Sequence, residues 1–498
     1  MARHLIAELS DKAGKRMSGF ATRIFLKEKL NNWQGYALMA FLACLFGVLE
    51  AIDVVSGFML FAVLLGSLLL LVFLTDAEFC FYFVMFYAFW ISFFNACFFH
   101  VSLMIGVPYD IMIFLLFVSL LFTRPGARTR LKTFVKIPLV AYFFLVVFLY
   151  NVLEVFNPNH VSDFNTATLI FRKYADFFIL LFSAYTLLNT MENIKKFSNI
   201  LLIVAGVSAL YGCIQQWHGL FYWDLDGIMS NPRAYALLFI NGDFRKFGTM
   251  ADPAIYGILM AACALYFLII AIYEKDRRLR TFYFIGIILM VLAVGYSGTR
   301  TAYATLIIGL AFFILLNIAK PAIRRLAIFA VAAYLVLMYG PGAGIGTIRR
   351  FRTTFSGTQD ESYKVRMQAR AFIQPFIRTH PIGGGLLTTN GAANENDHSG
   401  DPLAGFQTDG AYVARATETG YIGLAITCIL YFMIMKVGIT GFFRARAPAT
   451  RVYYSACLSA LFSLFIAEYT QAAVGGVTDS LFFFPLIGIM LNLKDLDT

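Results

Sequence analysis

The sequence predicts an all-α, polytopic integral membrane protein with about 12–14 transmembrane helices and one long loop on the outer side. Hydrophobic residues make up 60% of the 498 residues and charged residues only 14%, whereas a soluble domain averages about a quarter charged residues. Lipid admits a spanning segment only as a helix or within a closed barrel. The net charge of +11 lies mostly in short segments between apolar runs, which indicates membrane orientation and no nucleic-acid partner.

The predicted spans follow from apolar runs of roughly 20 residues, the length that crosses the hydrocarbon as a helix. Residues 1–33 are basic, and the apolar run after them is too long for a cleavable signal peptide, so we expect a retained first span. The runs near Tyr109, Tyr174 and Val477 are short, and without some of them the count falls to twelve. The expected spans begin near Gln34, Val54, Glu78, Tyr109, Ile137, Tyr174, Phe197, Pro253, Thr281, Thr301, Ala322, Gly410, Val452 and Val477.

Basic residues gather in every second connection except the return near Thr75 to Glu78, and this alternation sets the expected topology because short cytoplasmic loops collect Lys and Arg. The basic connections are residues 124–136, 195–196, 275–280, 320–325 and 436–451. Both termini are then cytoplasmic. The expected divisions are a cytoplasmic segment at 1–33, transmembrane helices with short loops at 34–340, a long periplasmic loop at 341–409 and C-terminal transmembrane helices at 410–498.

Within the long loop, residues 362–378 have the pattern of an amphipathic helix. An apolar stripe runs along one face, while Arg366, Arg370 and Gln374 share the opposite face at a spacing of four. One interpretation is a helix that lies on the membrane surface with a solvated charged face. The other, compatible with it, is that Arg366 and Arg370 point together at an anionic substrate.

Two motifs narrow the function. "SGTRTAY" at residues 297–303 places Arg300 in a tight hairpin at the outer end of a span, and "HPIGGG" at 380–385 precedes "DGAYVARATETGYIGL" at 409–424. Together they resemble the O-antigen ligase and O-antigen polymerase superfamily of bacterial surface-polysaccharide enzymes. In that family a short "S-R-T" hairpin precedes a long periplasmic loop that ends in "H-N-x-Y-L-x-x-x-x-E-x-G-x-x-G". The resemblance covers residues 252–423.

The resemblance implies a GT-C-like glycosyltransferase of the inner membrane, metal-independent, inverting and without a cofactor. Its donor would be an undecaprenyl-diphosphate-linked glycan, transferred en bloc onto a growing polysaccharide or a lipid-core acceptor during O-antigen, exopolysaccharide or capsule synthesis. Other polysaccharide-assembly proteins are candidate partners beside the lipid bilayer. Peptidoglycan polymerisation by the shape and division family is a related interpretation, although that family has other motifs.

The expected site must stabilise a departing diphosphate, and fixed guanidinium groups near a low-dielectric boundary do this well. Arg300 matches the arginine position of the family and is our first candidate for catalysis. Further substrate-binding candidates rest on location alone. They are Arg172, Arg233, Arg245, Arg366 and Arg370.

The attacking hydroxyl needs a proton acceptor, and here the chain departs from the family pattern. The family's His-Asn pair falls on Asp409 and Gly410. Asp409 is therefore a candidate general base, or an N-cap of the next helix, or both. His380 is a candidate substitute, or a turn residue that bonds to the backbone. Tyr412 and Glu418 match the family's tyrosine and glutamate and are expected at the substrate-binding site. The missing histidine favours a polymerase over a ligase.

The competing class is a transporter or lipid-linked oligosaccharide flippase. It predicts charges deep within the spans and two similar halves, whereas polar residues of this chain gather toward the outer ends of spans. A non-catalytic scaffold would not need outward arginines at helix ends. A metal site in the loop at 386–407 is imaginable, but its acidic residues and His398 match no ligand spacing, and a mobile polar loop is favoured.

Overall fold

The computed structural model describes part of the chain, which folds into two compact units. The described residues lie within 40–497. Those left out of this range are 42, 46, 49–65, 68, 100–105, 125, 128, 132–138, 160, 161, 163, 231, 241, 342, 343, 345, 356–360, 390–402, 404, 405, 407 and 409. One unit comprises Met1–Met85 and Gly106–Lys136, and the other comprises Phe86–Ile105 and Ile137–Thr498. The spans predicted from Gln34 and Val54 lie largely outside the described residues.

The first unit contains α5 (Gly106–Thr123) and the beginning of α4 (Ala77–Phe94). Arg124, which follows α5, donates to Glu78 on α4 at 2.9 Å. The rest of α4 belongs to the second unit and continues into one turn of π-helix, η2 (Asn95–Phe99).

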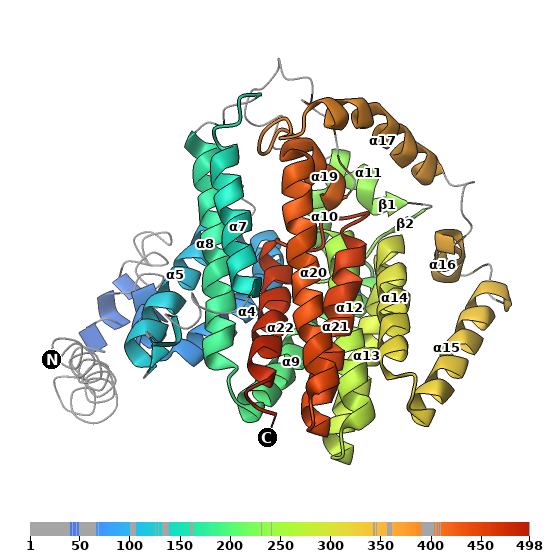
Figure 1. Ribbon diagram of the computed structural model, residues 1–498, viewed down its shortest axis with the longest axis horizontal. Coiled ribbons are helices and arrows are strands. Elements are labelled where there is room, and N and C mark those ends of the chain that lie inside the picture. Colours follow the sequence, from blue (N-terminus) through green and yellow to red (C-terminus); the bar gives the residue numbers. More distant parts are fainter. Residues whose placement is uncertain are drawn as a thin grey trace. The chain divides into compact units, whose positions relative to one another are not determined.

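The second unit carries most of the helices (Figure 1). They are α7 (Leu139–Glu154), α8 (Phe164–Leu187), α9 (Met191–Trp217), α10 (Tyr222–Met229), α11 (Pro232–Leu238), α12 (Pro253–Tyr273), α13 (Arg277–Ser297), α14 (Arg300–Asn317), α15 (Pro321–Tyr339), α16 (Gly346–Phe355), α17 (Glu361–Thr379), α19 (Ala411–Glu418), α20 (Gly420–Arg444), α21 (Pro448–Ala467) and α22 (Val477–Leu493). Between α11 and α12, β1 (Phe239–Ile240) and β2 (Asp243–Phe244) form a short antiparallel hairpin that pairs Phe239 with Phe244.

The helices confirm an all-α, multi-pass membrane protein. Within the part of the chain that the structure describes, nine helices are long and apolar enough to cross a membrane. They are α4 with η2, α5, α9, α12, α13, α14, α15, α20 and α21. The helices α7 and α22 are apolar but shorter. The helix α8 carries Arg172, Lys173 and Asp176, and it begins at Phe164 instead of near Tyr174.

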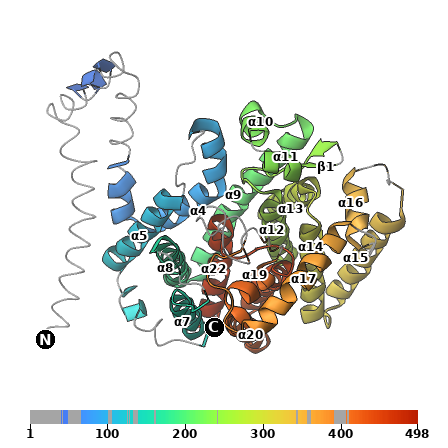
Figure 2. The same ribbon diagram turned by 90° about the horizontal axis from the view of Figure 1, so that it is seen from above.

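The helix α12 forms the centre of the second unit, where it packs against α9, α13 and α14 (Figure 2) and against α21. In its most apolar stretch 83% of the residues are buried, against 6% for α15. Close packing depends on glycine at two positions. A Cβ on Gly257 of α12 would lie 2.3 Å from Ser297 Oγ, and one on Gly309 of α14 would lie 2.2 Å from Leu265. These helices therefore approach each other more closely than larger side chains allow.

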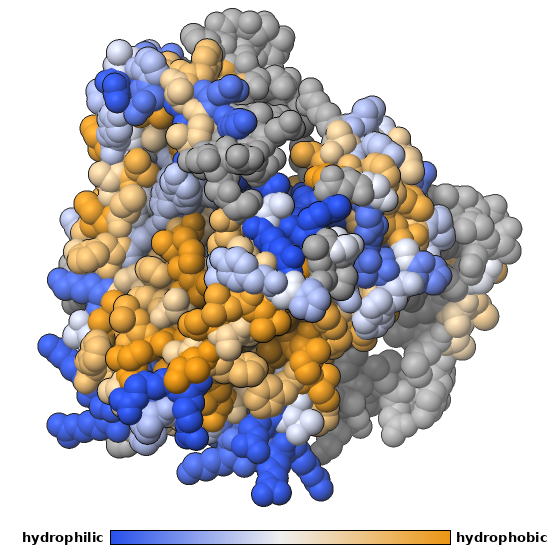
Figure 3. All heavy atoms as spheres, turned by 90° about the vertical axis from the view of Figure 1, so that its right-hand side faces the viewer, coloured by the Kyte–Doolittle hydropathy of each residue, from blue (hydrophilic) through white to orange (hydrophobic). Residues whose placement is uncertain are grey.

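The helices α16 and α17 lie at one end of the second unit, the end where α19 leads into α20 (Figures 1 and 2). On the face that Figure 3 shows, an apolar belt lies between hydrophilic residues at the two ends, as expected for a membrane-spanning bundle. The predicted amphipathic helix is α17. Its Ile373 and Ile377 are buried against Leu403 and Ala416, so its apolar face packs on protein, while Phe372 is exposed.

Candidate functional site

The turn between α13 and α14 is short and fixed by hydrogen bonds. Gly298 ends α13 in the left-handed region, with φ 57° and ψ 22°, which glycine adopts without steric cost. Thr299 Oγ1 donates to the carbonyl of Pro253, the first residue of α12, at 2.9 Å. Because α12 is the buried centre of the unit, this turn holds Arg300, the first residue of α14, at a defined position at the end of the bundle.

Arg245 binds the same turn from the segment between β2 and α12. Its Nε donates to the Ser297 carbonyl at 3.0 Å, and its Nη2 donates to Thr299 Oγ1 at 2.7 Å. Burial, followed by the charge of Arg350, lowers the pKa of Arg245 to about 10. The guanidinium is therefore still charged at neutral pH. The sequence offers Arg245 as a candidate by location only, and the structure joins it to the hairpin of Arg300.

Arg350 on α16 reaches the turn from the other side. A Cβ on Gly298 would lie 3.3 Å from both Cδ and Nε of Arg350, so the arginine side chain lies directly against the glycine. The Nε atom is buried and has no hydrogen-bond acceptor among the residues that the structure describes. Burial lowers the pKa of Arg350. This side chain thus brings a donor to the turn that no described protein group uses.

Arg300 and Arg366 line one cavity of about 360 Å³ beside the turn. Arg366 comes from α17. The other walls come from α14, α16 and the end of α21, and they combine hydroxyl groups with aliphatic side chains. Their residues are Thr301, Ala304, Thr305, Ile308, Thr353, Thr354, Ile466, Ala467, Tyr469 and Thr470. The cavity therefore places two guanidinium groups beside an apolar surface, while the hydroxyls of Thr305, Thr353 and Thr354 donate to main-chain carbonyls.

Positive charge is concentrated around this cavity. The residues Arg245, Arg300, Arg350 and Arg366, called the arginine cluster below, are close enough to act on one another: Arg350 on Arg245 and Arg300, and Arg366 on Arg300. Asp252 offsets part of the charge of Arg245. Like charges repel, so a bound anion lowers the free energy of such an arrangement. Guanidinium groups bind phosphate oxygens in a bidentate manner, and the cluster is suited to an anion that carries several of them.

Arg370 lies one turn after Arg366 on α17 but contacts protein. Its Nη1 donates to the Tyr469 hydroxyl, its Nη2 donates to the Tyr469 carbonyl at 3.1 Å, and its guanidinium carbon lies 4.1 Å from the centre of the Tyr469 ring. The two predicted arginines of α17 thus divide their contacts. Arg366 faces the cavity, and Arg370 attaches the helix to the end of α21.

The glycine turn after α17 is bound to the junction between α19 and α20. Gly383 has φ 78°, and a Cβ there would lie 2.3 Å from the carbonyl oxygen of Glu418. Gly420 has φ 67°, and a Cβ there would lie 2.0 Å from the carbonyl oxygen of Pro381. The N–H of Gly385 donates to the Glu418 carbonyl at 3.0 Å. The glycines of the two motifs therefore allow two main-chain segments to touch.

His380 is engaged at the end of α17. Its ring stacks on Phe376 with ring centres 4.1 Å apart, and its Nδ1 lies 2.9 Å from Thr379 Oγ1 and 3.0 Å from the Phe376 carbonyl. It does not line the cavity of Arg300 and Arg366. These contacts favour the interpretation of His380 as a turn residue that bonds to the backbone.

Tyr412 and Glu418, which match the family pattern, both make hydrogen bonds within the protein. The Tyr412 hydroxyl donates to the Phe465 carbonyl at 2.7 Å. Glu418 Oε1 accepts from Thr389 Oγ1 at 2.5 Å, and burial raises the pKa of this carboxyl group. Both residues therefore hold α19 in place, Tyr412 against α21 and Glu418 against the loop that follows the glycine turn.

Asp409 lies outside the described residues. Its neighbour Gly410 packs on the main chain of Tyr469, where a Cβ would come within 2.4 Å of the carbonyl oxygen. Since Tyr469 also lines the cavity of the arginine cluster, the start of α19 lies beside that cavity.

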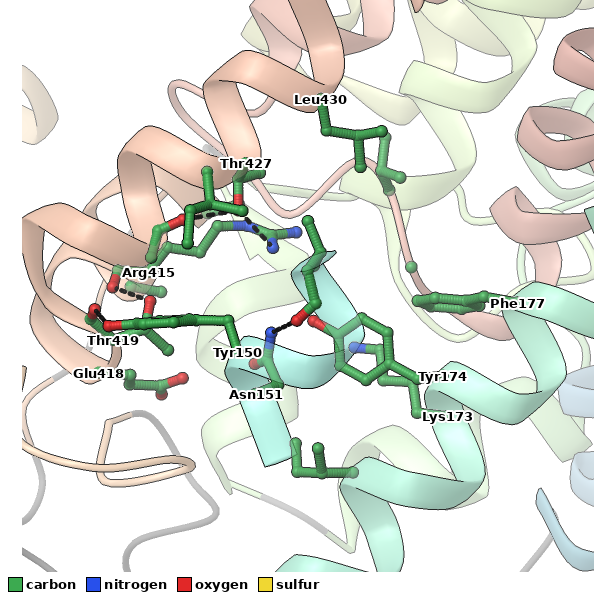
Figure 4. A pocket seen from close by; sticks show the side chains of 18 of the residues that line it. Tyr150, Asn151, Lys173, Tyr174, Phe177, Arg415, Glu418, Thr419, Thr427 and Leu430 are labelled. Carbon is green, nitrogen blue, oxygen red and sulfur yellow. Dashed lines mark hydrogen bonds between the residues drawn. The ribbon is translucent and has the colours of Figure 1, made fainter. Parts of the chain in front are cut away.

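A second cavity, of about 200 Å³, lies between α7, α8, α20 and α22 (Figure 4). Arg415, Glu418 and Lys173 line it, whereas Arg172, the substrate-binding candidate next to Lys173, does not. In Figure 4 the guanidinium of Arg415 and the side chains of Tyr174 and Lys173 point into the space between the helices.

Sequence reasoning did not single out Lys173 and Arg415, which line this cavity, or Glu468, which lies beside Arg415. Arg415 Nη2 lies 3.9 Å from Glu468 Oε2, and Glu468 Oε1 accepts the N–H groups of Ala473 and Val474 at 2.7 and 2.8 Å. One signal was present, because Arg415 and Glu418 are three residues apart on one helix and so share a face.

Comparison with known families points to one of them. Residues 285–428 match the family model described as O-Antigen ligase. The matched segment includes the turn before Arg300, the helices α14 to α17, α19 and the start of α20. The match supports the O-antigen ligase and polymerase superfamily, which the hairpin and helix motifs resemble. The chain has no match among the curated proteins compared.

Proposed function

We propose that this protein, whose segment 285–428 matches the O-antigen ligases, is a membrane glycosyltransferase of the O-antigen ligase and polymerase superfamily. Its donor is a glycan linked to a polyprenyl diphosphate such as undecaprenyl diphosphate. The glycan is transferred en bloc to an acceptor hydroxyl during synthesis of a surface polysaccharide.

The arginine cluster is the observation that carries this proposal. A diphosphate with an attached polyprenyl chain needs two neighbouring environments, one for several negative charges and one for hydrocarbon. Arg300 and Arg366 supply the first in a cavity whose walls also include Ile308 and Ile466, and these apolar walls suit the second. Arg245 and Arg350 add charge at the turn that precedes Arg300. The diphosphate then binds where α14, α16 and α17 meet.

In the proposed reaction the acceptor hydroxyl attacks the anomeric carbon of the donor from the side opposite the phosphate. The new glycosidic bond forms, the bond from the anomeric carbon to the diphosphate oxygen breaks, and the configuration inverts. The leaving diphosphate keeps the electron pair, and the arginine cluster stabilises its charge. Guanidinium groups that are held in place before the reaction need no reorganisation as the negative charge develops on the diphosphate.

The hydroxyl proton goes to a base, and Asp409 remains our candidate. Its neighbour Gly410 packs on Tyr469, which lines the cavity of the arginine cluster. His380 is the weaker candidate because its Nδ1 already contacts Thr379 and the Phe376 carbonyl. A carboxylate within hydrogen-bond reach of the acceptor hydroxyl suffices for this step.

The proposed location is the bacterial inner membrane, with both termini in the cytoplasm and the arginine cluster at the periplasmic side. The alternation of basic connections supports this orientation. A polymerase, which extends a growing chain, is favoured over a ligase because the family's histidine is replaced by Asp409.

The decisive experiment separates donor binding from transfer. The purified protein is first titrated with undecaprenyl diphosphate, and then incubated with a synthetic polyprenyl-diphosphate oligosaccharide, with and without chelator. We expect Arg300→Gln to weaken diphosphate binding at least tenfold and to lower transfer about a hundredfold. Arg349→Gln is the matched control, because Arg349 is an exposed neighbour of Arg350 on α16 and lines no described cavity.

Released undecaprenyl diphosphate with a longer glycan supports the polymerase, and a glycan on a lipid core supports the ligase. Equal effects of Arg300→Gln and Arg349→Gln would contradict the site. Movement of the intact donor across liposomes without any transfer would contradict the enzyme and favour the flippase. Loss of transfer on chelation would contradict the metal-independent mechanism.

A further inference from the structure

A third cavity lies far from the arginine cluster, at the opposite end of the helices. It has a volume of about 440 Å³ and is bounded by the last turns of α20, the start of α21 and the end of α22. The helix α20 begins at Gly420, beside the glycine turn, and ends at Arg444, a length of 25 residues. At about 1.5 Å per residue, this helix is long enough to separate the two ends by the thickness of a bilayer.

Three cationic side chains surround this cavity, namely Lys436 and Arg444 on α20 and Lys494 just after α22. All three are exposed, and none makes a hydrogen bond or ion pair with any residue that the structure describes. The cavity therefore has a positively charged rim whose donors are available to a ligand.

The carboxylate that lines the cavity is already used. Asp497 accepts hydrogen bonds from the N–H of Ala447 at 2.7 Å and from the N–H of Arg446 at 2.8 and 3.0 Å. These N–H groups precede α21, so the carboxylate serves the beginning of that helix. The backbone hydrogen bonds also lower the pKa of Asp497, which keeps it charged and bound there. With three cations and one engaged carboxylate, the lining has a net positive charge.

The inner wall is apolar. Val437, Met490 and Leu491 line it together with Tyr454. A Cβ on Gly441 would lie 2.5 Å from the Tyr454 ring, so the ring sits in a notch that glycine leaves in α20. The cavity thus has a cationic rim at the end of the helix bundle and an apolar inner wall. A ligand that contacts both must be amphipathic.

We propose that this cavity binds the phosphate of an anionic phospholipid from the adjacent leaflet, with the acyl chains against Val437, Met490 and Leu491. Basic pockets between transmembrane helices recognise such head groups, and the long side chains of Lys and Arg reach the phosphate while their methylene groups cover apolar surface. Basic residues at an inner end are also expected for topology alone. The cavity distinguishes these three, because it brings them together around one apolar pocket.

The test uses the full-length protein in detergent, with retention of phosphatidylglycerol measured by native mass spectrometry. Phosphatidylcholine and inorganic phosphate are the comparison ligands. The triple variant K436Q/R444Q/K494Q removes the cationic rim. The matched control is R277Q/R278Q/R280Q, which removes three cations from the first turn of α13 that line no described cavity. We expect the first triple variant to bind phosphatidylglycerol about a hundredfold more weakly, and the control to bind it as the parent does.

Each outcome decides the matter. Equal retention of phosphatidylglycerol and phosphatidylcholine, or equal losses in the two triple variants, would overturn the proposal in favour of diffuse surface charge. Binding of inorganic phosphate at the same affinity would replace the lipid with a soluble ligand. If the triple variant fails to fold, Lys494→Glu tests the same cavity at an exposed residue after α22 and should weaken lipid retention at least tenfold. Undecaprenyl diphosphate binding at the arginine cluster stays unchanged, so this test is independent of the proposed enzyme activity.

Discussion

Arg370 contacts Tyr469 in three ways. Its two terminal nitrogens donate to the hydroxyl and the carbonyl of Tyr469, and its guanidinium carbon lies 4.1 Å from the centre of the Tyr469 ring. This contact joins α17 to the end of α21. Arg366 precedes Arg370 by one turn on the same face of α17. The contact of Arg370 with Tyr469 therefore also holds Arg366 in the wall of the cavity that it lines together with Arg300.

The first prediction concerns this attachment. Arg370→Gln removes a cation over an aromatic ring and two charge-assisted hydrogen bonds, so we expect α17 to detach more often and proteolysis near it to become faster. In a double-mutant cycle with Tyr469→Leu, the coupling should be about 1 kcal/mol. Arg378→Gln is the control, since Arg378 is exposed in the last turn of the same helix. Additive effects of the two substitutions would show that Arg370 and Tyr469 do not stabilise each other.

The second prediction concerns Gly298, which has φ 57° and lies against Arg350. Alanine there is strained by about 1–2 kcal/mol and places a methyl group 3.3 Å from Arg350 Cδ. We expect Gly298→Ala to lower the thermal stability and also to weaken undecaprenyl diphosphate binding in a titration. Gly206→Ala in α9 is the control, because its Cβ would meet nothing within 4 Å. If Gly298→Ala bound undecaprenyl diphosphate as the parent does, Arg350 would not be part of the anion site.

The third prediction concerns the contact between the glycine turn and α20. Gly420→Ala brings a methyl group within 2.0 Å of the Pro381 carbonyl oxygen, so the two segments must separate. We expect a loss of about 2–4 kcal/mol in the free energy of unfolding, from strain and overpacking together. Gly126→Ala has the same kind of backbone strain, with φ 80° and no atom within 4 Å, and should cost less than half as much. Equal losses would mean that the close contact adds nothing.

The fourth prediction concerns the pH dependence that Glu418 contributes. Burial raises the pKa of Glu418 above 4.5, although the hydrogen bonds of Thr389 and the charges of Lys173 and Arg415 oppose the shift. The folded state therefore keeps a proton at pH values where the unfolded state has lost it. The contribution of Glu418 to stability is then largest at low pH, and it falls as the pH rises from 4.5 through the folded-state pKa.

Glutamine does not titrate, so Glu418→Gln should reduce the drop in melting temperature between pH 4.5 and pH 8. The melting temperature is measured in detergent by thermal unfolding at both pH values. Glu192→Gln, at an exposed position in the first turn of α9, should leave the drop unchanged. A drop as large in Glu418→Gln as in the parent would assign the pH dependence to other buried carboxyl groups, such as Glu468.

The sequence predicted features that depend on neighbours along the chain. The apolar runs that begin near Pro253, Thr301 and Ala322 correspond to α12, α14 and α15, because run length alone decides whether a helix crosses lipid. The tight turn before Arg300 and the two-faced helix α17 were also visible, since both are local patterns.

Contacts between distant segments were not predictable in the same way. Arg245 binds Thr299 across 54 residues, and Arg350 reaches Gly298 from a different helix, so no spacing rule reveals either contact. The small elements α10, α11, β1 and β2 lie between two predicted spans, and the sequence does not predict them because their apolar runs are short. Lys173 lines the second cavity and its neighbour Arg172 does not, because a helix turns by 100° per residue and the sequence does not fix that rotation.

The helix α15 has little contact with the rest of the protein, so its position should depend on the thickness of the bilayer. With 6% of its most apolar stretch buried, α15 is positioned by lipid more than by its neighbours, and its 19 residues match a hydrocarbon layer of about 30 Å. In a thinner bilayer the helix must tilt, and in a thicker one the bilayer thins around it or the residues at its ends snorkel to the interface. Because α16 follows α15 and carries Arg350, lipids of different chain length should shift that arginine relative to the buried turn of Gly298.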